Sequence, residues 1–356
     1  MLGEVYEFTI ERLPVLREKA AAVRFNSKVV EKFWISKEFR GRGVGCVVGV
    51  DGGRNWIECK NFVLYIVDAE AVIFEDEVEK GSLKVLDVDL LYPHRHVEDR
   101  VASYSEILEG KAAYKALQER SDGTVFMDGS IIGVLIRPPF RGYALGWDFE
   151  RELKEYVDIM ASSWSEVLED AIFSKRMLED VVKEYGEAGG AAASFLENAE
   201  KLLVYRRLLE EHGRRLVFVS KMSRGCDYFK FSKSDMSIFG ECTKGAGYSL
   251  PLHLEISNKV KWRFPVFNEY FRDFKVTMFY ARLEERGPVL RFEVPGFADE
   301  GKVEDVLAQA VAYSVSGYPY PLRKAHEEVK VSDEEAERVF RLVGIYEAER
   351  GREILE

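Results

Sequence analysis

Two aspartates in this 356-residue chain each follow a short, largely apolar run, and they constrain the fold more than any other feature. Asp51 follows the run Cys46–Val50 and precedes two glycines, and Asp128 follows Thr124–Met127 and precedes a Gly-Ser pair. The pattern predicts two buried strands that each end at an aspartate followed by a glycine turn. An Asp-Gly pair often does no more than start a turn. Burying a carboxylate is costly unless it is paired, hydrogen-bonded or bound to metal, so two such aspartates favour a functional site.

The order of the elements between these aspartates narrows the choice of fold. Apolar residues predict strands over residues 62–74 and 82–91, and the spacing predicts a helix from residue 97 to about 119. An acid on the opening strand, another on the first helix and a third at the tip of the fourth strand is the arrangement of the RNase H-like fold. Hard oxygen ligands placed in this way can bridge two divalent ions roughly 4 Å apart. We therefore expect an α/β protein with an RNase H-like mixed sheet flanked by helices.

The remainder of the chain predicts a helical insertion and a second group of strands. Residues 148–211 are dense in charge, helical in pattern and broken once at residues 186–190, while residues 1–40 are mostly helical. The sequence predicts further strands at 216–220, 252–256, 276–280 and 289–294, then helices at 302–314 and from Ser332, where Glu335 completes a capping box. We expect one domain over residues 1–356. Its core would comprise about 45–147 and 214–330, with a helical arm over 148–213 and a C-terminal helix over 332–350.

The predicted helix at 97–119 carries two acids on its sheet-facing stripe, Glu106 and Glu109. They alternate there with small and apolar residues, where acids are out of place on a core face. Either could complete a metal site with Asp51 and Asp128, and their spacing does not choose between them. The alternative is a solvated helix face that pairs with nearby lysines.

Charge and composition limit the classes of partner. The chain has 51 basic and 62 acidic side chains and a net charge of −11, so nucleic-acid binding requires a local basic channel. Its apolar runs are far shorter than the roughly 20 residues of a membrane helix, the four cysteines form no C-x-x-C pair, and the N-terminus lacks a signal-peptide pattern. We expect a soluble cytoplasmic protein without a membrane segment. The candidate DNA-binding cations are Arg137, Arg141, Lys221 and Arg224.

Four motifs in order resemble the NurA nuclease family of archaea and some bacteria. They are Val-Asp-Gly-Gly at 50–53, Met-Asp-Gly-Ser-Ile at 127–131, Val-Ser-Lys at 219–221 and Gly-Tyr-Pro-Tyr-Pro-Leu-Arg-Lys-Ala-His at 317–326. The resemblance implies a manganese-dependent nuclease, with magnesium as the alternative ion, that acts on DNA ends in double-strand-break resection. It also implies 5′–3′ exonuclease and single-strand endonuclease activity, a homodimer, and a partnership with the hexameric ATPase HerA.

The resemblance also assigns site residues. Asp51, Asp128 and one of Glu106 and Glu109 would be metal ligands, and Tyr318 and His326 would stand at the far side of the site. From its residue type, His326 could ligate the ion, or hold the scissile phosphate and move a proton. Two other functions compete with the nuclease: an actin-like ATPase, which also places Asp-Gly turns after strands, and a non-catalytic adaptor for a DNA motor.

Overall fold

The computed structural model describes residues 2–21, 25–39, 41, 45–120, 122–140, 148–260 and 263–344. Its centre is a ten-stranded mixed sheet with the strand order β1-β7-β9-β10-β6-β5-β2-β3-β4, in which β8 also pairs with β9. A separate two-stranded ribbon is formed by β11 and β12. The strands are β1 Trp34–Ser36, β2 Cys46–Glu58, β3 Val63–Glu75, β4 Val78–Leu90, β5 Thr124–Asp128, β6 Leu216–Ser220, β7 Gly247–Ser249, β8 Leu252–Glu255, β9 Lys275–Arg282, β10 Val289–Pro295, β11 Ser314–Val315 and β12 Tyr318–Pro319.

One half of the sheet has the predicted RNase H-like arrangement. Strands β2, β3 and β4 are consecutive and antiparallel, and β5 then pairs parallel to β2 and β6 parallel to β5. The strands predicted at 62–74, 82–91, 124–128 and 216–220 are confirmed. The short strands β1 and β7, which pair with each other beyond β9, were not predicted, and β1 lies in a segment predicted to be mostly helical.

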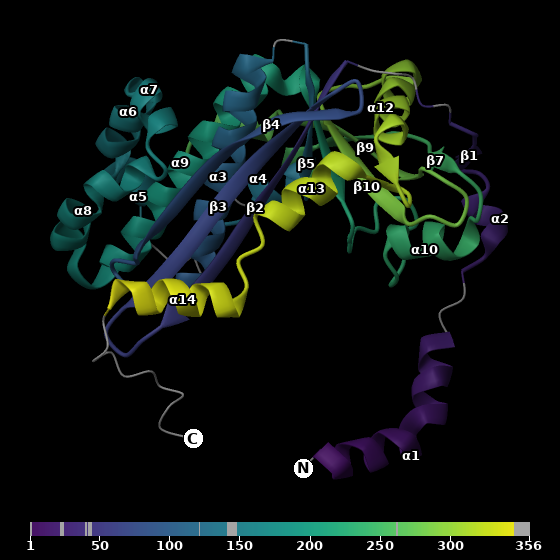
Figure 1. Ribbon diagram of the computed structural model, residues 1–356, viewed down its shortest axis with the longest axis horizontal. Coiled ribbons are helices and arrows are strands. Elements are labelled where there is room, and N and C mark those ends of the chain that lie inside the picture. Colours follow the sequence, from purple (N-terminus) through teal and green to yellow (C-terminus); the bar gives the residue numbers. More distant parts are fainter. Residues whose placement is uncertain are drawn as a thin grey trace.

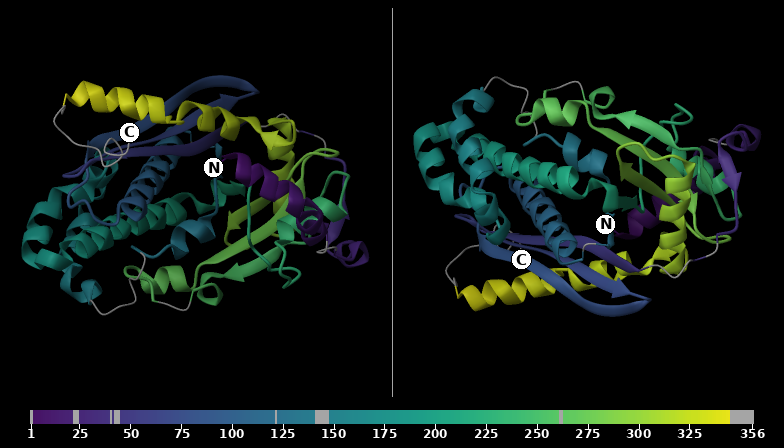
Figure 2. Two further views of the ribbon diagram at one scale, coloured as in Figure 1. Left: turned by 90° about the horizontal axis from the view of Figure 1, so that it is seen from below. Right: turned by 90° about the horizontal axis from the view of Figure 1, so that it is seen from above.

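Helices cover both faces of this sheet (Figures 1 and 2). Helix α3 lies against β2 and β3 on one face and is itself covered by α9, whereas α13 crosses β2 and β3 on the other face. The helices are α1 Leu2–Ala21, α2 Ser27–Val30, α3 Val97–Glu119, α4 Ile131–Ile136, α5 Phe149–Glu152, α6 Lys154–Ser162, α7 Trp164–Glu169, α8 Leu178–Tyr185, α9 Gly189–His212, α10 Asp235–Cys242, α11 Asn268–Arg272, α12 Glu300–Ala312, α13 Tyr320–Glu328 and α14 Asp333–Val343. None of the helices in the described part of the chain is both long and apolar enough to cross a bilayer.

The predicted turn after Asp51 is wrong, because β2 continues without interruption to Glu58. Gly52 and Gly53 stay paired with Ala69 and Asp68 of β3. Their missing side chains instead make room for neighbours on opposite faces of the sheet. A Cβ at position 52 would overlap the carboxylate of Glu109, and a Cβ at position 53 would overlap the carbonyl of Val329. These glycines therefore allow close packing across the strand.

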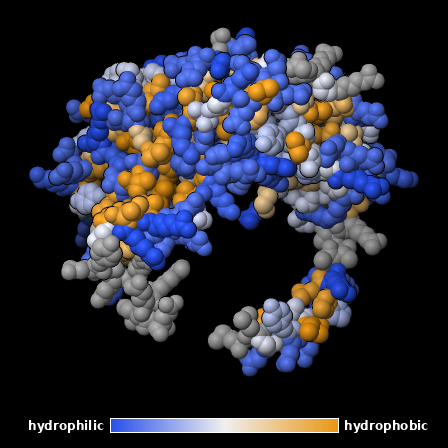
Figure 3. All heavy atoms as spheres, in the orientation of Figure 1, coloured by the Kyte–Doolittle hydropathy of each residue, from blue (hydrophilic) through white to orange (hydrophobic). Residues whose placement is uncertain are grey.

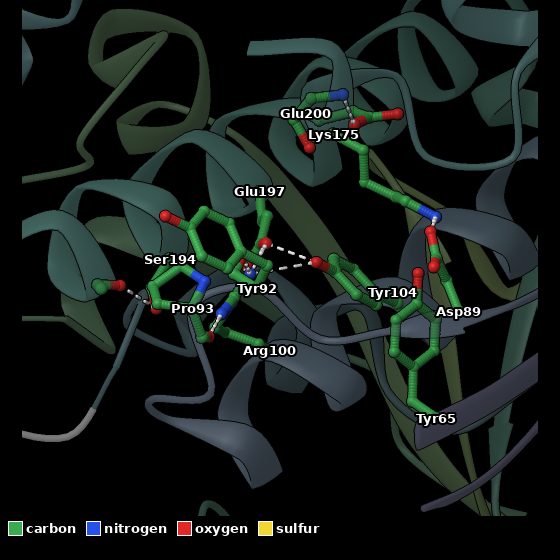
Figure 4. A network of polar contacts seen from close by, with 12 residues as sticks. Tyr65, Asp89, Tyr92, Pro93, Arg100, Tyr104, Lys175, Ser194, Glu197 and Glu200 are labelled. Carbon is green, nitrogen blue, oxygen red and sulfur yellow. Dashed lines mark hydrogen bonds and ion pairs between the residues drawn. The ribbon is translucent and has the colours of Figure 1, made fainter. Parts of the chain in front are cut away.

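The segment predicted as a helical arm is helical, but it contains several breaks instead of one. Helices α5 to α8 are short, and α9 runs for 24 residues along α3, with most of its side chains buried. Gly110 of α3 permits the close contact, because a Cβ there would lie 2.7 Å from Val204. Buried ion pairs cross this helix interface, including Arg100 with Glu197 (Figure 4). The division of the chain into core and arm stays a prediction.

The C-terminal helix begins as the sequence predicts. The Ser332 hydroxyl accepts from the Glu335 N–H while the Glu335 carboxylate accepts from the Ser332 N–H, which is a complete capping box. Helix α14 ends at Val343 with Gly344 in the left-handed region. The remainder of the predicted helix, residues 345–350, lies outside the described residues.

Candidate metal centre

The structure brings Asp51, Asp128 and His326 together. One ligand atom from each lies within 4.8 Å of the others, and no second such group of at least three occurs among the described histidines, cysteines and acids. Strands β2 and β5 are adjacent and parallel, and Val50 is the register partner of Met127. Asp51 and Asp128 are the next residues on these strands, so they lie side by side. The two aspartates that the sequence singled out are therefore neighbours across two strands.

His326 reaches this pair from α13, which lies on the face of β2 that carries the Asp51 side chain. Helix α13 begins with Pro321 in its first turn and passes so close to β2 that a Cβ at Gly49 would overlap the Pro321 backbone. The contact places His326 Nδ1 2.7 Å from Asp51 Oδ2. The His326 side chain remains 56% exposed, so the site is open to solvent on this side.

The electrostatics of the cluster favour a cation. Burial and the nearby charge of Asp128 raise the pKa of Asp51 to about 6, and the hydrogen bond from His326 only partly opposes the shift. A raised carboxyl pKa means that negative charge is under-compensated at this point. Two carboxylates and an imidazole form a donor set suited to a divalent metal ion, so the residues present fit one.

The two glutamates of α3 have different surroundings. Glu109 lies beside β2 at Gly52, where it accepts from Ser105 Oγ at 3.2 Å. Burial raises its pKa well above the ordinary range, and Asp51 is the charge that adds most to the shift. Glu106 instead pairs with two cations, at 2.9 Å from Arg137 Nη1 and 3.3 Å from Lys201 Nζ. Glu109 is therefore close enough to Asp51 for the two charges to interact, although it lies on the opposite face of β2, whereas Glu106 is paired with two cations of its own.

Lys221 and Tyr318 both contact Asp128. The Lys221 ammonium lies 3.0 Å from Asp128 Oδ2, and the Tyr318 hydroxyl donates to Asp128 Oδ1 at 3.3 Å. Lys221 also stands over the Tyr318 ring. Burial, together with the charges of Asp128 and Asp51, raises the pKa of Tyr318.

Of the other sequence-predicted catalytic residues, Tyr318 and His326 thus contact the aspartates. Glu109 lies against Gly52 on the opposite face of β2, and Glu106 is held by its own cations.

The predicted DNA-binding cations are spread more widely. Arg137 directly follows α4 and is bound to Glu106. Arg224 is exposed in the segment after β6, three residues beyond Lys221. Arg141 lies outside the described residues.

Two acids on β3 near this cluster, Asp68 and Glu70, were not predicted from the sequence. Glu70 is the register partner of Asp51 and Asp68 that of Gly53, so both acids share the face that carries Asp51. Lys84 lies between them, 3.1 Å from Glu70 and 3.9 Å from Asp68. Burial raises the pKa of Asp68 to about 6. The sequence does contain a signal for them, because the two acids stand two residues apart among apolar residues of β3.

Comparisons with known proteins identify relatives of this chain. Residues 46–331 match the profile of the NurA domain. The DNA double-strand break repair nuclease NurA of Sulfurisphaera tokodaii is 27% identical over 97% of this chain and 96% of its own length. The crystal structure of the NurA nuclease from Sulfolobus solfataricus superposes with a TM-score of 0.74 at 23% identity, covering 97% of each chain. A NurA structure with bound dAMP and manganese gives a TM-score of 0.66 at 17% identity, covering 96% of each chain.

The family profile spans the RNase H-like strands, the helical segment and α13, so it includes every element that contributes to the metal centre. The fold of the solved relatives supports the same assignment along nearly the whole chain. The chain therefore belongs to the NurA family.

Proposed function

We propose that this protein is a metal-dependent DNA nuclease that processes the ends of double-strand breaks. The observation that carries the proposal is the cluster of Asp51, Asp128 and His326 on an RNase H-like sheet. The family relationship supports it, because relatives that match almost the full chain are named DNA double-strand break repair nucleases.

The residues of the site have distinct roles in this proposal. A divalent cation held by Asp51, Asp128 and His326 would supply Lewis-acid chemistry at a phosphodiester, and Glu109 would add negative charge from the opposite face of β2. Lys221 neutralises charge on the phosphate. The Tyr318 hydroxyl, whose raised pKa keeps it protonated, orients Asp128.

Manganese suits the donor set better than magnesium. Magnesium strongly prefers an all-oxygen octahedral shell, whereas a shell with an imidazole nitrogen is more usual for transition metals. The manganese in a solved NurA structure is consistent with this choice. The proposed cofactor is therefore Mn²⁺, with Mg²⁺ as the weaker alternative.

DNA would approach from the side where the cations lie. Lys221 and Arg224 follow β6, and Arg137 follows α4, the helix after β5, so the segments beyond β5 and β6 carry positive charge. Cations on phosphates are the general means by which an acidic protein binds DNA locally. The family resemblance extends the proposal to 5′–3′ exonuclease and single-strand endonuclease activity, and to a HerA-type hexameric ATPase as partner.

An actin-like ATPase is less well supported. That class predicts two repeated RNase H-like halves, and the described residues contain one such set of five strands, β2 to β6. The family profile covers that set and the elements after it as one NurA domain.

The direct test is incubation of the purified chain with end-labelled single-stranded and double-stranded DNA. We expect cleavage with manganese, weaker cleavage with magnesium, and none in excess chelator, because the donor set needs a divalent ion. Comparing the earliest products from DNA labelled at the 5′ end with those from DNA labelled at the 3′ end gives the polarity of digestion. Cleavage that persists in chelator would contradict the proposed metal chemistry.

We also expect a homodimer in solution. Helix α1 extends away from the body and exposes apolar side chains, including Tyr6, Phe8 and Ile10 (Figures 1 and 3). A 20-residue helix with Pro14 in its interior is marginal alone in water, so it needs a surface to pack on. Light scattering should give twice the chain mass of 40.8 kDa.

The combined substitutions Tyr6→Ser, Ile10→Ser and Leu16→Ser should shift that mass towards the monomer. The matched control is Ile159→Ser, which alters an exposed apolar residue of α6 and should leave the dimer intact. A wild-type monomer at all concentrations would contradict the expectation.

A further inference from the structure

Two charged residues of β10 are buried behind the metal centre. Arg291 and Glu293 form an ion pair with 2.5 Å between Nη2 and Oε1, and Glu293 is fully buried. Asp128 is the register partner of Val219, which is the partner of Phe292. Because side chains alternate along a strand, the ion pair lies on the face opposite the Asp128 carboxylate.

Glu293 holds the segment that directly follows Asp128. The Ser130 hydroxyl contacts both carboxylate oxygens, at 2.8 and 2.9 Å, and the Ile132 N–H donates to Oε2 at 3.2 Å. Between Asp128 and Ser130, Gly129 adopts a φ of 101° and donates to the Val219 carbonyl. The backbone that carries Asp128 is therefore tied both to β6 and to Glu293.

Arg291 contacts the loop that follows β6. Its Nη1 donates to Ser223 Oγ at 3.1 Å, and a Cβ at Gly225 would lie 3.2 Å from the same nitrogen. This segment starts at Lys221, whose ammonium is 3.0 Å from Asp128 Oδ2. One ion pair thus contacts both the loop after Asp128 and the loop that carries Lys221.

We propose that Arg291 and Glu293 are positioning residues that set the separation of Asp128 and Lys221 and thereby the affinity of the metal centre, an inference that rests on the proposed function. A buried ion pair contributes little net stability compared with an apolar pair of similar volume, so stability alone does not account for it. Partners that orient ligands typically change metal affinity 10- to 100-fold when removed. Both residues act through the loops that they contact.

The test measures Mn²⁺ binding by electron paramagnetic resonance without DNA, together with the thermal midpoint in chelator. Glu293→Gln is expected to weaken Mn²⁺ binding about 10- to 100-fold. The double variant Arg291→Met with Glu293→Leu removes both charges at once, so it avoids a lone buried charge and should stay folded. Its Mn²⁺ affinity should fall by the same factor as that of Glu293→Gln, even if its thermal midpoint equals that of the wild type.

The matched control is Glu197→Gln, which breaks the fully buried pair with Arg100 between α3 and α9 (Figure 4). It should lower the thermal midpoint and leave Mn²⁺ affinity unchanged. The inference is overturned if the β10 variants bind Mn²⁺ within about twofold of the wild type, or if Glu197→Gln weakens binding equally. An Asp51→Asn variant that binds Mn²⁺ as tightly as the wild type would instead overturn the proposed metal centre itself.

Discussion

Asp51→Asn and Asp128→Asn are each expected to reduce manganese-dependent DNA cleavage by at least about 10³-fold, because several kcal/mol of transition-state stabilisation depend on the metal that these carboxylates hold. Asparagine keeps the shape of the side chain and removes the charge. The measurement is initial cleavage rate on end-labelled DNA over a manganese titration, with the fold checked by circular dichroism.

The matched control for these variants is Asp68→Asn. Asp68 lies on the same sheet face, on the strand next to Asp51, and its pKa is raised in the same direction, but it pairs with Lys84 instead of belonging to the cluster. Its variant should keep a rate within about threefold of the wild type. Undiminished cleavage by Asp51→Asn would contradict the proposed metal centre, whereas a wild-type chain that fails to cleave DNA with any divalent ion would favour the non-catalytic adaptor.

The same Asp51→Asn variant should stabilise the metal-free protein at neutral pH. The pKa of Asp51 is about 6 in the folded chain against about 3.9 unfolded, so folding with this carboxyl ionised costs about 1–3 kcal/mol above pH 6. The cost shrinks as the pH falls through 6 and disappears below about 4, where both states are protonated. In chelator the variant should melt about 2–6 °C above the wild type at pH 7.5, and by less at pH 5.

Glu109→Gln is expected to lose at least about 100-fold in manganese-dependent activity, whereas Glu106→Gln should retain activity within about tenfold. The reason is placement, since Glu109 lies against Gly52, close enough to Asp51 for the two charges to interact, whereas Glu106 is engaged by Arg137 and Lys201. Cleavage over a manganese titration separates the two variants.

For the thermal midpoint we expect the opposite order, with Glu106→Gln the more destabilising of the two variants. Glu106→Gln leaves the fully buried Lys201 without its anionic partner, which typically costs about 3–5 kcal/mol, so its thermal midpoint should fall. Glu109→Gln removes a buried carboxyl with a raised pKa and should not lower the midpoint at neutral pH. An active Glu109→Gln beside an inactive, normally stable Glu106→Gln would reverse the assignment of the two residues.

Local pattern was sufficient for the RNase H-like half of the sheet and for its two aspartates. The strand at 124–128, the helix at 97–119 and the capping box at Ser332 follow from alternation, helical spacing and cap chemistry, which act over a few residues. The adjacency of Asp51 and Asp128 then follows from parallel pairing of their strands.

Prediction from local pattern was wrong or incomplete where the role of a residue depends on contacts with a segment distant in the chain. The sequence predicts a turn at Gly52 and Gly53, yet both are strand residues. Because they have no side chain, Glu109 of α3 and the chain after α13 can pack closely against them. Asp68 and Glu70 were overlooked because their nearness to Asp51 depends on cross-strand register with β2.

The sequence by itself determined the fold class, the order of the strands along the chain and the identity of the two aspartates, since these depend on short-range periodicity and on residue type. Only the tertiary structure showed that Glu106 and Glu109 have different surroundings, because both lie on one helix stripe and differ in what α9 and the loop after α4 bring against them. It also decided that Arg291 and Glu293 stand behind the site. Coulombic and hydrogen-bond partners come from segments far apart in the chain, and their meeting is a property of packing that no local pattern encodes.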